Sequence, residues 1–309
     1  MRRKKEVSVK VKVWGGRGSL PLAENSVFGG NTSCASVSLA HNELLVFDAG
    51  SGIVPLGQRL VEAGTPLPLI RVFLSHLHWD HIMGLPFFAP FFLSASPIEV
   101  FLPRDPVGNA SAKLWQQMQF CGWSEDERRR CNVKFREIDE GEVLDFGAFS
   151  VNTIALCHPA LDFGYRVSCA GKSFCYCTDV ESLENKLLRN GFDLEEVRSG
   201  SIPWEKAIIN PRHRELVRFL EGVDLCLHEA MYSRQEYSQK VGWGHSPVDF
   251  VTDMAYVARV QKLRLFHYSP DYSDAQLTEL EAEIKERAQS FGEYLDVALA
   301  REGEEYVVE

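Results

Sequence analysis

The stretch LIRVFLSHLHWDHIMGLPFF, residues 69–88, decides how the rest of the sequence is interpreted. It begins as an apolar, β-branched run of the kind that forms a buried strand. It then places His76, His78, Asp80 and His81 within six residues. Desolvating so many polar side chains at the end of a core strand is costly unless something binds them. The pattern therefore indicates a functional site at the end of this strand.

The composition is that of a globular protein with a full core. The chain has 309 residues, 45% of them hydrophobic, and no linker-like segment divides it, so we expect a single domain over 1–309. A formal net charge of −10 disfavours nucleic acid as the main partner. The sequence has neither the apolar run of a membrane span nor the apolar region of a signal peptide. We therefore expect a cytoplasmic protein with no membrane partner.

The order of apolar segments predicts an α/β fold. Strand-like segments follow one another through the first half of the chain and alternate with helical patterns later. This order predicts two mixed β-sheets packed face to face with helices outside, an αββα four-layer sandwich. The charged, mostly helical segments 104–130 and 181–222 are candidates for covering the site and selecting the substrate.

Seven of the nine histidines fall at predicted strand ends or in adjacent loops, whereas His41 and His213 lie in polar surroundings and are set aside. A metal turns such crowding into binding energy, because it takes neutral imidazoles and ionised carboxylates. Nitrogen and oxygen ligands suit Zn, Mn or Fe. The candidates are too many for one tetrahedral ion and would suit two ions about 3.5–4 Å apart. These candidates are His76, His78, His81, His158, His228, His245 and His267, together with Asp80 and Asp179.

The motifs also resemble a known family. SHLHWDH, residues 75–81, resembles the HxHxDH signature of the metallo-β-lactamase superfamily. Later segments resemble, in the same order, the motifs of the branch that contains the tRNA 3′-processing endonuclease RNase Z and its phosphodiesterase relatives. The likeness extends over nearly the whole chain and implies the metallo-β-lactamase fold. The later segments are LCHPALDFGYRV (156–167), CYCTDV (175–180), LHEAMYS (227–233), GWGHS (242–246) and LFHYSPDY (265–272).

The resemblance implies a two-metal hydrolase in which a bridging hydroxide is the nucleophile. It implies that Asp80 orients this hydroxide and accepts its proton, and that His245, paired with Glu229, protonates the leaving group. Asp48, in VFDAGSG, matches an aspartate that steadies a ligand histidine from behind. His228 neighbours Glu229 on the strand and should face the other way. The implied ligands are His76, His78 and His158 for the first metal, Asp80, His81 and His267 for the second, and Asp179 as the bridge.

Further residues are candidates for substrate binding. The glycine loops GGRGS and GGNTS resemble loops that lie beside the metals in the family, so Arg17 and Asn31 are expected to contact substrate. Trp79 and Trp243 are candidates for stacking on a base. In each case an ordinary structural use of the residue is the alternative.

The expected reaction is phosphodiester hydrolysis, on a small substrate such as a cyclic nucleotide. Twenty residues separate His158 from Asp179, too few for the tRNA-gripping arm that RNase Z carries there. Met231, Pro247 and Asp271 also stand where the family's motifs have threonine, threonine and arginine. An RNase Z-like endoribonuclease and a glyoxalase-II-like thioesterase are the alternatives. By resemblance, a homodimer is expected.

Overall fold

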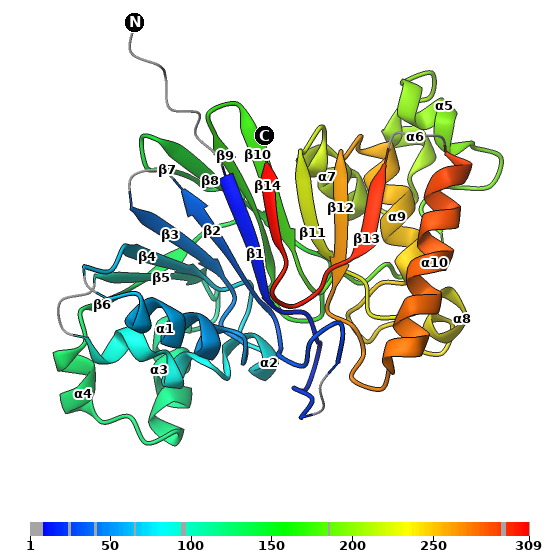
Figure 1. The fold of residues 1–309 in the computed structure, drawn as a ribbon. Helices are drawn as coiled ribbons and strands as arrows, with labels where there is room; N and C mark the ends of the chain where they lie inside the picture. The colour runs from blue at the N-terminus through cyan, green and yellow to red at the C-terminus, as the bar shows by residue number, and fades with distance from the viewer. Residues whose placement is uncertain are drawn as a thin grey trace, which may run out of the picture.

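The computed structural model describes residues 9–23, 26–39, 42–64, 66–93, 97–184, 186–291 and 295–308. His41 lies outside these residues. The described strands form two sheets of seven strands each (Figure 1). No helix in the described part of the chain combines the length and apolar character needed to cross a bilayer.

The first sheet has the strand order β14-β1-β2-β3-β4-β5-β6. Its neighbours are antiparallel from β14 to β3 and parallel from β3 to β6. The sheet is therefore mixed, as predicted. Its strands are β1 (Val9–Gly15), β2 (Cys34–Leu39), β3 (Glu43–Phe47), β4 (Leu69–Phe73), β5 (Ile98–Pro103), β6 (Val133–Ile138) and β14 (Glu305–Val308).

The second sheet has the order β13-β12-β11-β10-β9-β8-β7. It is antiparallel from β7 to β10 and parallel from β10 to β13, so it is mixed as well. Its strands are β7 (Val143–Asp145), β8 (Phe149–Ala155), β9 (Phe163–Cys169), β10 (Lys172–Cys177), β11 (Leu225–Glu229), β12 (Lys262–Phe266) and β13 (Asp296–Leu299).

Aromatic side chains join the two sheets at the centre of the sandwich. Phe47 and Phe73 of the first sheet stack with ring centroids 5.5 Å apart. Phe47 also lies 5.5 Å from the ring of Tyr176 and 5.6 Å from that of Phe174, both in the second sheet. Such contacts bury large apolar areas and add specific ring–ring attraction. The predicted face-to-face packing of two sheets is confirmed.

The helices cover the outer faces, which completes the predicted four layers (Figure 1). Residues of α1 and α3 pack on the first sheet, and residues of α7, α9 and α10 pack on the second. The helices of the first half are α1 (Ile53–Glu62), α2 (Trp79–Ile82), α3 (Ala110–Phe120) and α4 (Glu125–Arg130), with 3₁₀ turns at Leu85–Phe87 and Ala89–Phe92. Those of the second are α5 (Leu194–Ser199), α6 (Trp204–Ala207), α7 (Pro211–Leu220), α8 (Arg234–Tyr237), α9 (Val248–Val257) and α10 (Asp274–Ser290).

Segments 104–130 and 181–222, the two candidates for covering the site, lie in different parts of the fold. The start of segment 104–130, including the first turn of α3, borders the histidines of the β4–α2 loop. In segment 181–222, α5 and α7 pack against α9 on the outer face of the second sheet. Apart from its first residue, Glu181, and from His213, most of this segment supports the sheet and does not cover the site. The apolar side of α5 and α7 is buried in this packing.

The strand ends bring the chemistry together. Parallel neighbours present their carboxyl ends at the same edge of a sheet, and polar residues placed just after them meet there. Asp48, Asp179 and His267 follow β3, β10 and β12, with positive φ angles of 59°, 32° and 63°. Non-glycine residues are held in this region only where the surroundings fix them, commonly at functional sites.

Candidate metal centre

The first group of potential ligands draws on both sheets. Four side-chain atoms lie within 4.8 Å of one another, one from each of His76, His78, His158 and Asp179. His158 Nε2 is 3.4 Å from His78 Nδ1, and His76 Nε2 is 3.5 Å from an Asp179 oxygen. Residues more than one hundred positions apart in the sequence therefore converge on one point.

The second group forms because the chain turns after His78. The short helix α2 begins at Trp79 and carries Asp80 and His81 to a separate point, where they meet His267. His267 Nε2 lies 3.1 Å from His81 Nε2 and 3.1 Å from Asp80 Oδ2. The turn that the motif spacing suggested is thus present, and it divides one motif between two ligand groups.

Asp179 faces both groups, and it also lies close to His245 and His267 in a third set of potential ligands. Its Oδ2 atom faces His76 Nε2 at 3.5 Å, whereas its Oδ1 atom faces His81 Nε2 at 3.4 Å and His267 Nε2 at 3.3 Å. Thr178 also donates a hydrogen bond to Oδ1. One carboxylate with an oxygen directed at each group is the arrangement that a bridging ligand needs.

The donor set fits divalent cations. Burial, followed by the neighbouring charge of His81, holds the pKa of His76 well below its usual range, and burial lowers the pKa of His158 to about 4. Burial also lowers the pKa of His78. Metals bind the neutral form of imidazole, so these rings are in the right state near neutral pH. The buried Nε2 atom of His76 has no hydrogen-bond partner within the described structure, which leaves it free for coordination.

Asp48 lies behind His81, at the position that the sequence suggested. His81 Nδ1 donates to Asp48 Oδ2 at 2.7 Å, and the same carboxylate accepts from Tyr176 and from the hydroxyl and amide of Ser75. The carboxylate is fully buried. Such a partner fixes the ring orientation and the tautomer, so that Nε2 of His81 faces the ligand group.

Asp162, which the sequence motifs did not indicate, lies behind His76. Its Oδ1 atom is 3.6 Å from His76 Nδ1, and neither carboxylate oxygen has a hydrogen-bond partner in the described structure. The side chain is fully buried, and burial, followed by the charge of Asp179, raises its pKa well above the usual range. The available signal was an aspartate four residues after His158 at the start of an apolar strand.

Glu181, which the sequence motifs also did not indicate, holds the loop that carries His245. Glu181 Oε2 accepts from the amide of Gly244 at 2.7 Å, and the Gly244 carbonyl accepts from His158 Nδ1 at 2.9 Å. Gly244 has φ +96°, and a Cβ atom there would lie 2.5 Å from the His158 ring. Only glycine allows this approach, so the loop and the ligand histidine are positioned together.

His213 is buried, contrary to the expectation of polar surroundings. Its Nε2 donates to the carbonyl of Glu181 at 3.1 Å, and its ring contacts Phe250 edge-on. Burial lowers its pKa to about 4. Arg212 and Glu215, beside it in α7, are exposed. An amphipathic helix places such charged residues on the face opposite its buried one, and these neighbours made the surroundings of His213 look polar in the sequence.

Glu229 and His245 face each other beside the second group. His245 Nδ1 is 3.7 Å from Glu229 Oε2, while Glu229 Oε1 accepts from the amides of Val180 and Ser246. Burial disfavours charge on His245, but Glu229, followed by Asp179, raises its pKa to about 8. Burial raises the pKa of Glu229. His228 points away from this pair, as expected, and donates to the Glu229 carbonyl.

The candidate substrate residues separate into two kinds. Arg17 is 1% exposed, and its guanidinium donates to three carbonyls, of Gly29, Ser269 and Tyr272, and to the Ser26 hydroxyl. These donors hold the glycine loop to the segment that follows β12. Asn31 is similarly engaged by the side chains of Glu302 and Ser51. Trp79 and Trp243, by contrast, are 47% and 61% exposed beside the ligand histidines.

Comparison with known proteins agrees with this architecture. A family model described as the beta-lactamase superfamily domain matches residues 44–195. Ribonuclease Z of Lactococcus lactis is 28% identical over 255 residues, which cover 75% of this chain and 80% of that protein. The human short-form tRNase Z structure has a TM-score of 0.60 at 18% identity, covering 97% and 99% of the two chains. Unliganded yeast PDE1 has a TM-score of 0.64 at 16% identity, covering 98% and 100%.

These findings define the class: the chain has the metallo-β-lactamase fold, a fold that implies divalent metal ions held by histidine and aspartate. Residues 44–195 match the beta-lactamase superfamily domain, and most of the chain is similar to proteins named Ribonuclease Z, as the sequence motifs indicated. The family resemblance is confirmed.

Proposed function

We propose that this protein is a dinuclear metal-dependent phosphodiesterase that acts on a small phosphodiester such as a cyclic nucleotide. The observation that carries the proposal is the placement of Asp179, whose two oxygens face two separate ligand groups. The Glu229–His245 pair beside these groups supplies a proton donor for a leaving oxygen.

The ligand assignment follows the geometry. When bound, two ions, Zn or Mn with Fe as a further candidate, would neutralise phosphate oxygens and lower the pKa of water. The three-histidine group offers nitrogen ligands, and the second group mixes nitrogen with carboxylate oxygen. The proposed ligands are His76, His78 and His158 for one ion, Asp80, His81 and His267 for the other, and Asp179 for both.

Asp80 is proposed as the acceptor of the proton from the attacking water. The amide of Ser19 donates to its Oδ2 atom at 2.7 Å, and His267 lies 3.1 Å from the same oxygen. His81, followed by hydrogen bonding from His267, outweighs burial and lowers the pKa of Asp80 well below the usual range. The carboxylate is thus ionised and held in one orientation.

His245 is proposed as the acid that protonates the leaving oxygen. With a pKa of about 8 its ring is charged near neutral pH, and a general acid works best when its pKa lies near the operating pH. The Glu229 carboxylate, fixed by two backbone amides, compensates that charge. His245 is close to the second ligand group, because its ring centroid is 5.1 Å from that of His267.

The chain's charge and spacing support a small substrate. A net charge of −10 opposes binding to a long phosphate backbone, and the 20 residues between His158 and Asp179 form only a strand pair. An RNase Z-like endoribonuclease is the second candidate, because the curated relative from Lactococcus lactis is named Ribonuclease Z.

Hydrolysis assays with one substrate panel test the proposal. The protein, reconstituted with Zn or Mn, is offered 2′,3′- and 3′,5′-cyclic nucleotides, a precursor tRNA and a glutathione thioester. Turnover of cyclic nucleotides is expected. Cleavage of tRNA alone would favour the second candidate, and turnover of the thioester alone would exclude a phosphodiesterase.

A further inference from the structure

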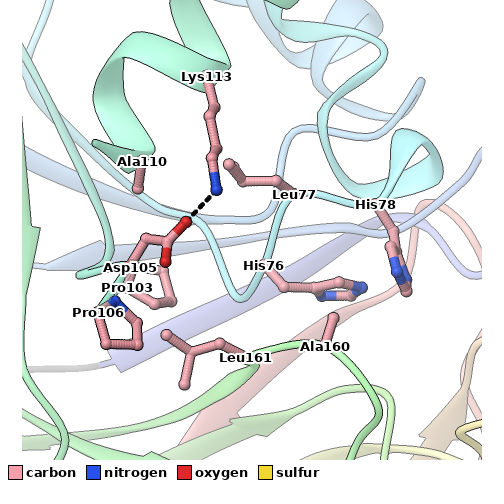
Figure 2. Close-up of a pocket in the computed structure, with 10 residues that line it drawn as sticks. All are labelled: His76, Leu77, His78, Pro103, Asp105, Pro106, Ala110, Lys113, Ala160 and Leu161. Atoms are coloured by element: carbon pink, nitrogen blue, oxygen red, sulfur yellow. Dashed lines mark hydrogen bonds and ion pairs between the residues drawn. The ribbon is translucent and has the colours of Figure 1, made fainter. Parts of the chain in front are cut away.

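A cavity of about 360 Å³ opens beside the first ligand group (Figure 2). His76 and His78 form one end of it, and the start of α3 forms the other. Small-molecule sites in proteins commonly have volumes of about 300–1,000 Å³. We call this cavity the Lys113 pocket. It is the right size for a compact organic group attached to a phosphate at the histidines.

The walls of the Lys113 pocket are mostly apolar. Leu77 and Leu161 lie on opposite sides, and Pro106 and Ala110 close the space between them. Leu161 is 43% exposed, an exposure that a bound group would reduce. Apolar walls of this kind favour a group with flat or aliphatic faces.

Polar atoms occur at the far end of the pocket. Lys113 Nζ and the Asp105 carboxylate form an ion pair there, and Figure 2 shows them facing each other away from the histidines. Asp105 also accepts from the amide of Val107 at 2.9 Å. The end of the pocket therefore offers a fixed acceptor next to a donor.

The helix α3 makes this end rigid. Asn109 caps the helix by accepting from the amide of Ala112. Ala110 and Lys113 are three residues apart and so lie on the same face of the helix. A site built on a helix is better preorganised than one built on a loop.

The charge of the Lys113 pocket favours a neutral, hydrogen-bonding group over a second phosphate. Lys113 is the one cationic side chain among the described residues that line it, and Asp105 neutralises it. Grooves that follow a nucleic-acid backbone need cations that are free to neutralise phosphates. A second phosphate would find none here, whereas a neutral group with a hydrogen-bonding edge would find both a donor and an acceptor.

We propose that the Lys113 pocket binds the non-reacting part of the substrate, a neutral nucleoside-sized group whose heteroatom edge meets Asp105 and Lys113. This subsite rests on the proposed phosphodiesterase function, and it names the substrate class. The apolar faces of a nucleobase would lie between Leu77 and Leu161, with the phosphate at the histidines.

Two esters with the same leaving group test the subsite. Thymidine 5′-(p-nitrophenyl) phosphate and methyl p-nitrophenyl phosphate release the same p-nitrophenolate and differ only in the non-reacting group. We expect kcat/KM at least tenfold higher for the thymidine ester. Leu161→Trp, which fills the pocket, and Lys113→Met, which removes the donor, should each bring the ratio of the two values close to one.

Matched controls come from outside the pocket. Val61→Trp adds the same side chain at a site of similar exposure on α1, and Lys10→Met removes another exposed ion pair, with Glu305. Both should keep the ratio of the wild type. A wild-type ratio near one, a ratio that the pocket variants leave unchanged, or an equal fall in the controls would overturn the subsite.

Binding separates the subsite from the proposed function. If the wild type hydrolyses neither ester, the proposed function fails, and calorimetric titration with thymidine 5′-monophosphate decides the subsite. Leu161→Trp should then weaken binding at least tenfold relative to Val61→Trp. Equal affinities of the two variants, or no binding by the wild type, would overturn the subsite as well.

Discussion

The two sheets contribute to the candidate site in different ways. The first sheet supplies its ligands from one continuous stretch, in which His76, His78, Asp80 and His81 follow β4. The second sheet supplies one residue at each of several strand ends, and these residues are far apart in the sequence. The first contribution depends on a local turn, whereas the second depends on strand order. Asp179 connects them because its strand, β10, lies at the centre of the second sheet.

The largest loss of metal and activity is expected from changing Asp179, which faces the ligand groups of both sheets. Asp179→Ala removes the oxygens that face both groups, so metal content should fall towards zero and hydrolysis should be abolished. His76→Ala removes a ligand of one group only and should abolish hydrolysis with a smaller loss of metal. Metal analysis of the purified variants beside Asp126→Ala, an exposed carboxylate on α4, measures the difference. Full activity in both site variants would refute the shared centre.

His245, which lies on the side of the second sheet, is proposed to act as a general acid and not to hold a metal. His245→Ala should retain its metal and lose about 10²–10⁴-fold in kcat on substrates with poor leaving groups, because it removes a general acid. The loss should be much smaller for p-nitrophenyl esters, whose leaving group needs no proton. Rates on an alkyl and a p-nitrophenyl ester of the same phosphate make the comparison. Equal losses on both would remove the role from His245.

A change at Asp162 tests whether a residue of the second sheet positions His76, a candidate ligand from the first sheet. Asp162→Asn replaces the carboxylate 3.6 Å from His76 Nδ1 with a neutral amide of the same shape. Removing a partner behind a ligand histidine typically lowers metal affinity about 10–100-fold. Competition titration with a coloured chelator should show this loss at one of the two sites. Asp139→Asn, an exposed residue, is the control, and unchanged affinity at both sites would show that Asp162 does not position His76.

The smallest expected effect is on stability, and it comes from His213, a histidine of the second half of the chain that belongs to neither ligand group. Burial lowers the pKa of His213 to about 4 from an ordinary value of 6.5. The unfolded chain therefore takes up the proton first, and the contribution of His213 to stability is lost as pH falls from about 6.5 to 4. The full loss would be up to about 3 kcal/mol.

Denaturant unfolding of the metal-free protein at pH 7 and pH 4.5 measures this effect. His213→Gln removes the titrating group, so its free energy of unfolding should fall less between the two pH values than that of the wild type. An identical fall in both proteins would show that His213 is not the buried group responsible.

The apolar pattern of the chain was enough to predict the strands and the two-sheet sandwich, and the motif residues were enough to propose the ligand chemistry. Apolar periodicity follows directly from burial, and a row of histidines at a strand end is a local pattern that needs no knowledge of distant neighbours. The six motifs in order also revealed the resemblance to the metallo-β-lactamase superfamily, because each motif is a short continuous segment.

The residues that support those candidate ligands could not be predicted from local sequence patterns. Asp162 and Glu181 lie behind His76 and Gly244, and Arg17 is buried in its loop, because separate strand ends pack together. The Lys113 pocket likewise joins the start of α3 to the loop after β8. Periodicity shows that a side chain is buried, but not which side chain from the other sheet it meets, because that depends on how the two sheets pack.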